Sequence, residues 1–166
     1  KTMELRRCRV EDLEEIRTLF TTTILTVNRR DYTDAQVRAW AGAAREFPRR
    51  QSFFLDLYTL VALEGTQLVG YGNIHESGYL DHLFVHRDYQ GRGIATALCN
   101  ALEAHAAAGG VERVTVHASL TARPFFLGRG YRLLREQRAE VGGVFLKNCA
   151  MEKLLTPGLE SPVPRK

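Results

Sequence analysis

The chain has 166 residues, 45% of them hydrophobic, which suits a single α/β domain large enough to bury its own core. The formal net charge of +4 and the sequence pI of about 9.2 favour an anionic ligand, but the arginines are scattered and are not interleaved with aromatic residues, which disfavours a nucleic-acid-binding protein. No run approaches the roughly 20 apolar residues of a membrane span, and no secretion signal is recognisable, so we expect no membrane association.

The first part of the chain predicts one strand and two helices. Residues 3–9 alternate in polarity, as in a strand with one buried face. Apolar residues recur at helical spacing over 13–24 after an acidic turn, which predicts a helix that packs on a core. Thr33 is a capping residue that opens a second, shorter helix with Val37 and Trp40.

Three strands are predicted next. Residues 57–63 and 68–74 are runs of strand-forming residues, and the sequence EGTQ at 64–67 is typical of a hairpin turn between them. Residues 79–85 form the third run, which follows a Ser-Gly pair. The first two of these strands are therefore expected to be antiparallel neighbours.

A helix and another strand follow the run at 79–85. Helical spacing of apolar residues, ended by a Gly-Gly pair, predicts the longest helix of the chain over 93–108. Residues 113–117 predict the next strand. A strand, a helix and a strand within this length make a parallel crossover, so the strands at 79–85 and 113–117 should run in the same direction.

The last part predicts a short helix over 121–127 and a closing hairpin of residues 131–141 and 144–153 across a Gly-Gly turn. These last strands also offer a surface for pairing with a second copy, so a homodimer is one possible state. The residues from 156 to 166 include three prolines and are expected to be a loose end. The single domain is therefore expected to cover residues 1–155.

The three cysteines, Cys8, Cys99 and Cys149, are odd in number and far apart. They form no CxxC or Cys/His spacing, which argues against a disulfide framework and against a zinc site. We therefore expect a cytoplasmic protein that carries no metal.

The sequence QGRGIA at residues 90–95 lies where a predicted strand gives way to the long helix. Helix N-termini leave backbone N–H groups unpaired and carry partial positive charge, so a glycine-rich turn into one suits a phosphate. No Lys-Ser or Lys-Thr pair follows, as a P-loop requires, and Thr96 stands at the third glycine position of a dinucleotide fingerprint. For the glycines alone, a sharp strand-to-helix turn without a ligand is an equal interpretation.

This QGRGIA sequence resembles the Q/R-x-x-G-x-G/A signature of the GNAT acyltransferase superfamily, and the preceding strand ends in Leu83-Phe84-Val85 as that family would have it. The sequences GYLDHLFVH and SLTARPFFLGRGY are similar to one bacterial branch of small GNAT enzymes. The resemblance covers residues 3–153. It implies an α/β fold with a mixed, mostly antiparallel central sheet, splayed parallel central strands and flanking helices.

The resemblance also implies acetyl-CoA as the co-substrate. It implies that main-chain groups of Phe84 and Val85 hold the pantetheine arm and polarise the thioester carbonyl. It further implies that the pyrophosphate is lined by Gln90, Gly91, Arg92, Gly93, Ile94 and Ala95.

Acetyl transfer to nitrogen needs a base, because an alkyl amine with a pKa near 10.4 is mostly charged at pH 7. Asp81 lies on the strand before the loop and His117 on the strand after the helix, so the two would approach the splayed cleft from opposite walls. His82 and Glu76, the latter through a water, are further candidates. The alternative for each is a hydrogen-bonded or partly exposed side chain without a catalytic role.

In the GNAT superfamily a tyrosine of the short helix usually protonates the departing thiolate, and here Phe126 stands at that position. Either Tyr131, Tyr79 or a water replaces it, or the thiolate leaves unassisted, since a thiol pKa near 8.5 makes a fair leaving group. The sequence thus predicts an N-acetyltransferase that moves an acetyl group from acetyl-CoA directly to a primary amine of a small molecule or peptide. The alternative is an acyl-CoA-binding sensor or scaffold without turnover.

Overall fold

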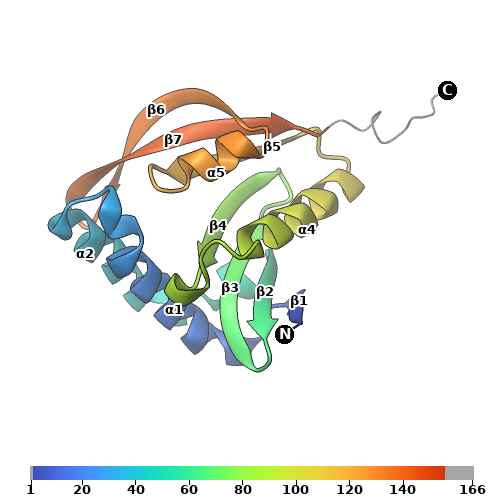
Figure 1. Ribbon diagram of the computed structural model, residues 1–166, viewed down its shortest axis with the longest axis horizontal. Coiled ribbons are helices and arrows are strands. Elements are labelled where there is room, and N and C mark those ends of the chain that lie inside the picture. The colour runs from blue at the N-terminus through green and yellow to red at the C-terminus, as the bar shows by residue number, and fades with distance from the viewer. Residues whose placement is uncertain (1, 156–166) are drawn as a thin grey trace.

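A computed structural model describes residues 2–155, and Figure 1 shows how its elements are arranged. In this part of the chain, seven strands form one sheet in the order β1-β2-β3-β4-β5-β7-β6. β4 and β5 are parallel neighbours, and the other neighbours are antiparallel. This confirms the predicted mixed sheet with parallel central strands. The strands are β1 (Met3–Arg7), β2 (Tyr58–Glu64), β3 (Gln67–Ile74), β4 (Tyr79–Val85), β5 (Arg113–Ser119), β6 (Arg132–Val141) and β7 (Val144–Leu154).

Helices cover both faces of the sheet (Figure 1). One hydrophobic core lies between the sheet and α4 and α5, and a second core lies between the opposite face and α1, α2 and α3. None of the helices within residues 2–155 has the length and apolar character needed to cross a bilayer. The helices are α1 (Leu13–Thr26), α2 (Asp34–Gly42), α3 (Gln51–Leu55), α4 (Ile94–Ala108) and α5 (Arg123–Gly128), with 3₁₀ turns η1 (Val10–Asp12), η2 (Asn28–Arg30), η3 (Ala43–Arg49) and η4 (Arg87–Tyr89).

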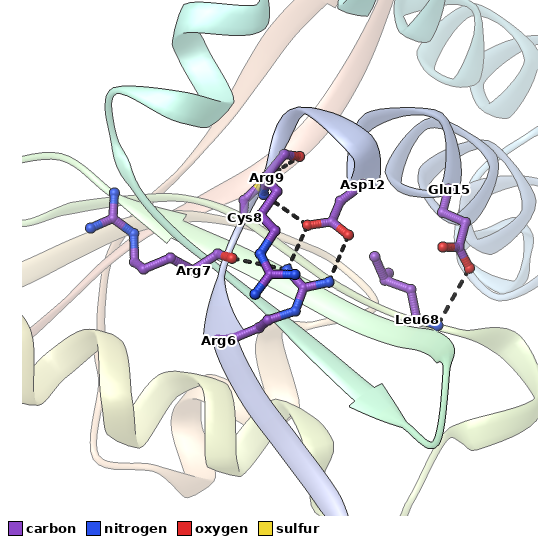
Figure 2. Close-up of polar contacts among 7 residues, drawn as sticks. All are labelled: Arg6, Arg7, Cys8, Arg9, Asp12, Glu15 and Leu68. Atoms are coloured by element: carbon purple, nitrogen blue, oxygen red, sulfur yellow. Dashed lines mark hydrogen bonds and ion pairs between the residues drawn. The ribbon is translucent and has the colours of Figure 1, made fainter.

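β1 ends at Arg7, before the predicted end at residue 9, because Asp12 folds the chain back. The Asp12 carboxylate accepts hydrogen bonds from the Arg6 guanidinium, at 2.8 and 2.9 Å, and from the backbone N–H of Arg9, at 2.8 Å (Figure 2). Burial alone would raise the pKa of Asp12, but these donors hold it below its usual value. The charged contact therefore turns the chain out of the sheet and into η1 and α1.

The sequence predicts no element over residues 43–56, yet this segment forms η3 and α3. Phe47 and Phe54 anchor it, because both are buried and their rings meet edge to face with centroids 4.9 Å apart. Pro48 lies inside η3, where a regular α-helix would be interrupted. The segment covers the α1 face of the sheet beside β2.

A buried carboxylate ties α4 to the C-terminal hairpin. Glu103 is 8% exposed and accepts hydrogen bonds from the Arg129 guanidinium at 3.0 Å, from Nζ of Lys153 at 3.0 Å and from the Tyr131 hydroxyl at 2.7 Å. Burial alone would raise the pKa of Glu103, but the three donors hold it below its usual value. The ionised carboxylate is thus fully compensated inside the fold.

Candidate functional site

The central parallel strands pair only where they begin. Tyr79 and Leu80 of β4 lie opposite Thr115 and Val116 of β5, and no later pair joins these strands in the described part of the chain. The strands therefore diverge toward the end at which β4 leads into α4.

A bulge in β4 lies at the point of divergence. Leu80 lies opposite Ile74 of β3 and His82 lies opposite Asn73, so Asp81 is the additional residue. A bulge bends its strand and increases the local twist. The bulge at Asp81 therefore turns β4 away from β5.

A cavity of about 770 Å³ occupies the space between the diverging strands. Its lining includes Ile94 and Phe126 from the core beneath α4, and Phe20 and Phe47 from the core beneath α1. The cavity thus passes through the sheet from one face to the other. We give its two ends the names α4 half and α1 half. The α4 half is lined by Gln90, Gly91, Gly93, Ile94, Ala95, Phe125 and Phe126, and the α1 half by Phe20, Trp40, Phe47, Arg50, Asp81 and His82.

The loop before α4 presents unpaired backbone donors to the cavity. Gly91 and Gly93 have φ values of +72° and +82°, in the left-handed region that glycine adopts without strain. Gly93 is the N-cap of α4, and its carbonyl accepts from the N–H of Ala97 at 3.0 Å. The backbone N–H groups of residues 90–96 have no hydrogen-bond partner among the described residues. The positive end of α4 is therefore available to an anion.

Five of the six residues expected around the pyrophosphate line the cavity: Gln90, Gly91, Gly93, Ile94 and Ala95. The side chain of Gln90 holds the loop against the end of β4, because its Nε2 donates to the carbonyls of Val85 at 2.8 Å and His86 at 3.4 Å. The sixth residue, Arg92, is not part of the lining. Its guanidinium lies over the ring of Tyr89, 4.7 Å from the centroid.

Phe84 and Val85 both line the cavity, but their main-chain groups face opposite ways. The Phe84 carbonyl lies beside Gly70 of β3. Because N–H and C=O directions alternate along a strand, those of Leu83 and Val85 face the gap toward β5. The Val85 carbonyl accepts there from Oγ1 of Thr23 at 3.0 Å. Leu83 also lines the cavity and was not predicted, although strand alternation from Val85 pointed to it.

Asp81 and His117, the two residues predicted as bases, both line the cavity. Asp81 Oδ2 lies 2.8 Å from Nε2 of His75, and His117 Nδ1 lies 3.4 Å from the hydroxyl of Tyr79. Burial, with a contribution from Asp81, raises the pKa of Tyr79 to about 12, so this phenol keeps its proton at pH 7. Carboxylate, imidazole and phenol groups are thus gathered where β4 and β5 part. His75 was not predicted.

His82 lies among aromatic rings. Burial is the main cause that lowers the pKa of His82 to about 4, so the imidazole is neutral at pH 7. Its Nδ1 lies 2.8 Å from the hydroxyl of the buried Tyr71. Six ring centroids lie between 4.9 and 6.1 Å from that of His82: those of Phe20, Phe47, Phe53, Phe54, Tyr71 and Phe84.

Comparison with known proteins identifies the family of the chain. A family model described as an acetyltransferase (GNAT) domain matches residues 28–155. The chain belongs to the GNAT acetyltransferase family. The family and the acyltransferase activity that the sequence predicts are thereby confirmed.

This GNAT chain is 34% identical to a GCN5-related N-acetyltransferase of Rhodopseudomonas palustris, also named a class-II aminotransferase. That crystal structure superposes with a TM-score of 0.90 over 93% of this chain and 97% of the other. The chain is 29% identical over 149 residues to YafP, an uncharacterized N-acetyltransferase of Escherichia coli K12, which covers 90% of this chain and 94% of YafP. PaiA N-acetyltransferase of Thermoplasma acidophilum, solved in complex with coenzyme A, shares the fold with a TM-score of 0.71 at 18% identity, over 93% of this chain and 100% of PaiA.

Phe126, at the position where the family resemblance implies an acid, and Tyr131, one of the suggested replacements, lie differently with respect to the cavity. Phe126 of α5 lines the cavity, and its ring packs edge to face against Tyr131 at 4.9 Å. Tyr131 is 3% exposed, lies outside the cavity lining and donates its hydroxyl proton to Glu103. Burial and Glu103 raise the pKa of Tyr131 well above its usual value. Of the two tyrosines considered as the acid, Tyr79 lines the cavity and Tyr131 does not.

None of the three cysteines lines the cavity. All three are free, with Cys99 and Cys149 buried and Cys8 half-buried. Among residues 2–155, no three His, Cys, Asp or Glu side chains gather into a group that would hold a metal ion.

Proposed function

We propose that this GNAT enzyme binds acetyl-CoA in the cavity and transfers the acetyl group to a primary amine of a small molecule or peptide by direct attack. The observation that carries the proposal is the run of unpaired N–H groups over residues 90–96 beside a cavity whose lining comes from both faces of the sheet. A diphosphate at this loop supplies the acceptors that these donors lack. PaiA, which has the same fold, was solved in complex with coenzyme A, which supports acetyl-CoA as the co-substrate.

In this proposal the two halves of the cavity hold different reactants. The α4 half takes the cofactor, with the diphosphate on the backbone of Gln90, Gly91, Arg92, Gly93, Ile94 and Ala95. The pantetheine arm runs along the side of β4 whose main-chain groups face the gap. The N–H of Val85 or of Leu83 then donates to the thioester oxygen, and one such preorganised donor contributes on the order of 3 kcal/mol to acyl transfer. The Phe84 main chain is bound to β3, so its ring is what contacts the reactants.

The acceptor enters from the α1 half as an ammonium ion and loses one proton to the Asp81 carboxylate, which His75 holds in place, so that a neutral amine remains. Its nitrogen lone pair attacks the thioester carbon, and the carbonyl electrons move to the oxygen. The C–S bond then breaks as the carbonyl re-forms, and the thiolate leaves. The attacking nitrogen passes its second proton to His117, while the Tyr79 hydroxyl gives its proton to the thiolate and is re-protonated by His117. His117 lies beside Tyr79 and is the second group able to move a proton there.

Phe126 favours a second candidate, an acyl-CoA-binding sensor or scaffold without turnover, because the usual family acid is absent from that position. Both candidates bind acetyl-CoA, so both predict ligand stabilisation of about 2.7 kcal/mol at a hundredfold excess over Kd. Continuous release of free thiol in the presence of an amine belongs to the enzyme alone.

The test is a panel of amines incubated with the full chain and acetyl-CoA, with free thiol detected over time and thermal unfolding followed in parallel. We expect ligand stabilisation together with multiple turnovers on at least one amine. Stabilisation without thiol release on any amine supports the sensor. Absence of both overturns the assignment of the loop.

We also propose that the chain forms a homodimer through its last strands. β6 lies at one edge of the sheet within the described residues, so its outer backbone groups are available to a second copy. Light scattering on purified protein measures the mass directly, and a monomeric mass at micromolar concentration contradicts the dimer.

A further inference from the structure

Two polar groups on the wall of the α1 half, the guanidinium of Arg50 and Nε2 of His82, have no hydrogen-bond partner among the described residues. The guanidinium of Arg50 takes part in no hydrogen bond or ion pair there, whereas that of its neighbour Arg49 bonds to Glu46 at 3.0 Å. His82 uses Nδ1 in a hydrogen bond but not Nε2. Both Arg50 and His82 line the cavity. A small number of polar groups on the wall of a mainly apolar cavity fix the orientation of a ligand.

The tautomer of His82 follows from the hydrogen bond to Tyr71. The side chain of Tyr71 is 0% exposed, and its hydroxyl has Nδ1 of His82, at 2.8 Å, as its partner within residues 2–155. A buried hydroxyl that donates to nothing is destabilising, so we assign its proton to the bond with Nδ1. The ring proton of the neutral imidazole then sits on Nε2. His82 therefore offers the cavity an N–H donor and not a base.

Phe53 of α3 links the two unpaired groups. Cζ of Arg50 lies 4.5 Å from the centroid of the Phe53 ring, and that centroid lies 4.9 Å from the centroid of His82. Arg50 and His75 both lower the pKa of His82, after burial, while Asp81 acts in the opposite direction. A cation and an anion therefore flank His82 in the α1 half of the cavity.

We propose that the amine acceptor is an amino acid or a similar zwitterion, whose carboxylate binds Arg50 and Nε2–H of His82 while its amine faces Asp81; this assignment rests on the proposed acetyl transfer. A guanidinium pairs with a carboxylate through two parallel hydrogen bonds, and a neutral imidazole N–H adds a third donor. The rings that line the same half favour an apolar or aromatic side chain on the acceptor: Phe20, Trp40 and Phe47.

The substrate test compares amines that share a side chain and a primary amine and of which one alone carries a carboxylate. L-Phenylalanine, L-phenylalaninamide and phenethylamine share the ring and the primary amine, and L-leucine, L-leucinamide and isoamylamine form a second matched set. We expect kcat/KM to be at least about tenfold higher for each amino acid than for its amide or its decarboxylated amine, since a charge-assisted pair is lost in the latter two.

Arg50→Gln tests the residue that reads the carboxylate. We expect kcat/KM to fall by about 10- to 100-fold for the amino acids, mainly through KM, and to change less than about threefold for the amides and amines. Arg50→Lys should retain part of the preference for amino acids, because lysine keeps the positive charge but lacks the two parallel N–H donors of the guanidinium. Arg49→Gln is the matched control, because Arg49 is adjacent, exposed and outside the cavity lining, and it should leave all six substrates unchanged.

Tyr71→Phe tests the positioning of His82. Nitrogen-15 NMR of the wild-type imidazole should show the proton on Nε2. The variant should shift the population toward the Nδ1–H form and reduce the preference for amino acids, with thermal unfolding measured in parallel to confirm that the fold persists. A wild-type ring protonated on Nδ1 contradicts the assigned tautomer.

The outcomes separate this inference from the proposed function. Equal kcat/KM for the three members of a set, or an Arg50→Gln effect that is the same for all of them, overturns the carboxylate site while acetyl transfer stands. A preference for the amides or amines over the amino acids does the same. Stabilisation by acetyl-CoA without turnover of any amine overturns both.

Discussion

The two halves of the cavity are built in different ways. The α4 half depends on main-chain N–H groups of one contiguous stretch, residues 90–96, shaped by two glycines in the left-handed region. The α1 half depends on side chains that come from segments far apart in the chain: Phe20 in α1, Trp40 in α2, Phe47 in η3, Arg50 before α3, and Asp81 and His82 in β4.

This difference assigns a task to each half. A backbone site is insensitive to most side-chain changes, so it suits the part of the reaction that stays constant, which in our proposal is the cofactor. A site built from side chains changes with each substitution, so it suits the selection and deprotonation of one acceptor. We therefore expect variants in the α4 half to alter the affinity of the enzyme for acetyl-CoA, whichever acceptor is used. Variants in the α1 half should alter the turnover rate and the preference among acceptors without altering that affinity.

The largest effect is expected for Asp81→Asn. A positioned base contributes about 10²- to 10⁴-fold, so kcat should fall by that range while the Kd of acetyl-CoA stays within about twofold. Steady-state thiol release and isothermal titration measure the two quantities. Glu76→Gln is the control, because Glu76 is exposed and outside the cavity lining, and it should retain full activity. A fall with Glu76→Gln in place of Asp81→Asn assigns the base to Glu76 and a water.

The next effect concerns the support of the α4 half. Glu103→Gln removes the carboxylate that compensates Arg129 and Lys153, and breaking a buried ionic group of this kind lowers the free energy of unfolding by about 3–5 kcal/mol. Chemical denaturation measures the loss. Glu112→Gln, which changes an exposed carboxylate just beyond α4, should leave stability within about 0.5 kcal/mol.

The same carboxylate gives a pH dependence of known sign. The pKa of Glu103 is held below its usual value of 4.5 in the folded state, so its stabilising contribution is present above that value and is lost as the pH falls through the folded pKa. The stability difference between wild type and Glu103→Gln should therefore be constant above about pH 6 and shrink below pH 4.5. A difference that grows as the pH falls contradicts the ionised state assigned to Glu103.

A smaller effect is expected for Gly93→Ala, and comparison with Gly110→Ala distinguishes backbone strain from loss of ligand binding in the α4 half. Gly93 and Gly110 lie at opposite ends of α4 with φ values of +82° and +85°, and a Cβ added at either meets no atom within 4 Å. Replacement by Ala should therefore lower the free energy of unfolding by about 1–2 kcal/mol at both positions. Gly93→Ala should also weaken acetyl-CoA binding by about tenfold, while Gly110→Ala should not. Equal affinities contradict the diphosphate site.

The elements of the α4 half could be predicted from the sequence because their signals are local. The loop was predicted because its residues are contiguous and its glycines have a local conformational reason to be there. β4 was predicted with its observed bounds, Tyr79–Val85, because alternation and flanking turns are local signals as well. The splay of the central strands was predicted from the family resemblance alone. Its physical cause is the bulge at Asp81, which depends on the register of β4 against β3.

The α1 half was predicted in part because its contacts are not local. Asp81 and His117 were found as polar residues on central strands, but the partner of Asp81, His75, depends on the register of β3 against β4. Tyr131 was considered as an acid because nothing in the order of residues shows that Glu103, on another element, lies within 2.7 Å of its hydroxyl. The segment that contains Arg50 carries neither regular helical nor strand periodicity.

The smallest effect is expected for Phe126→Tyr, which restores the usual family acid to the α4 half. A thiolate whose conjugate thiol has a pKa near 8.5 leaves readily, and Tyr79 already holds a proton on the cavity wall, so kcat should change by less than about threefold. In a Tyr79→Phe background the same substitution should recover activity, because the added hydroxyl then becomes the phenol donor. If Phe126→Tyr alone raises kcat by tenfold or more, the prediction is wrong. Departure of the thiolate in the α4 half then limits turnover, and deprotonation of the acceptor at Asp81 does not.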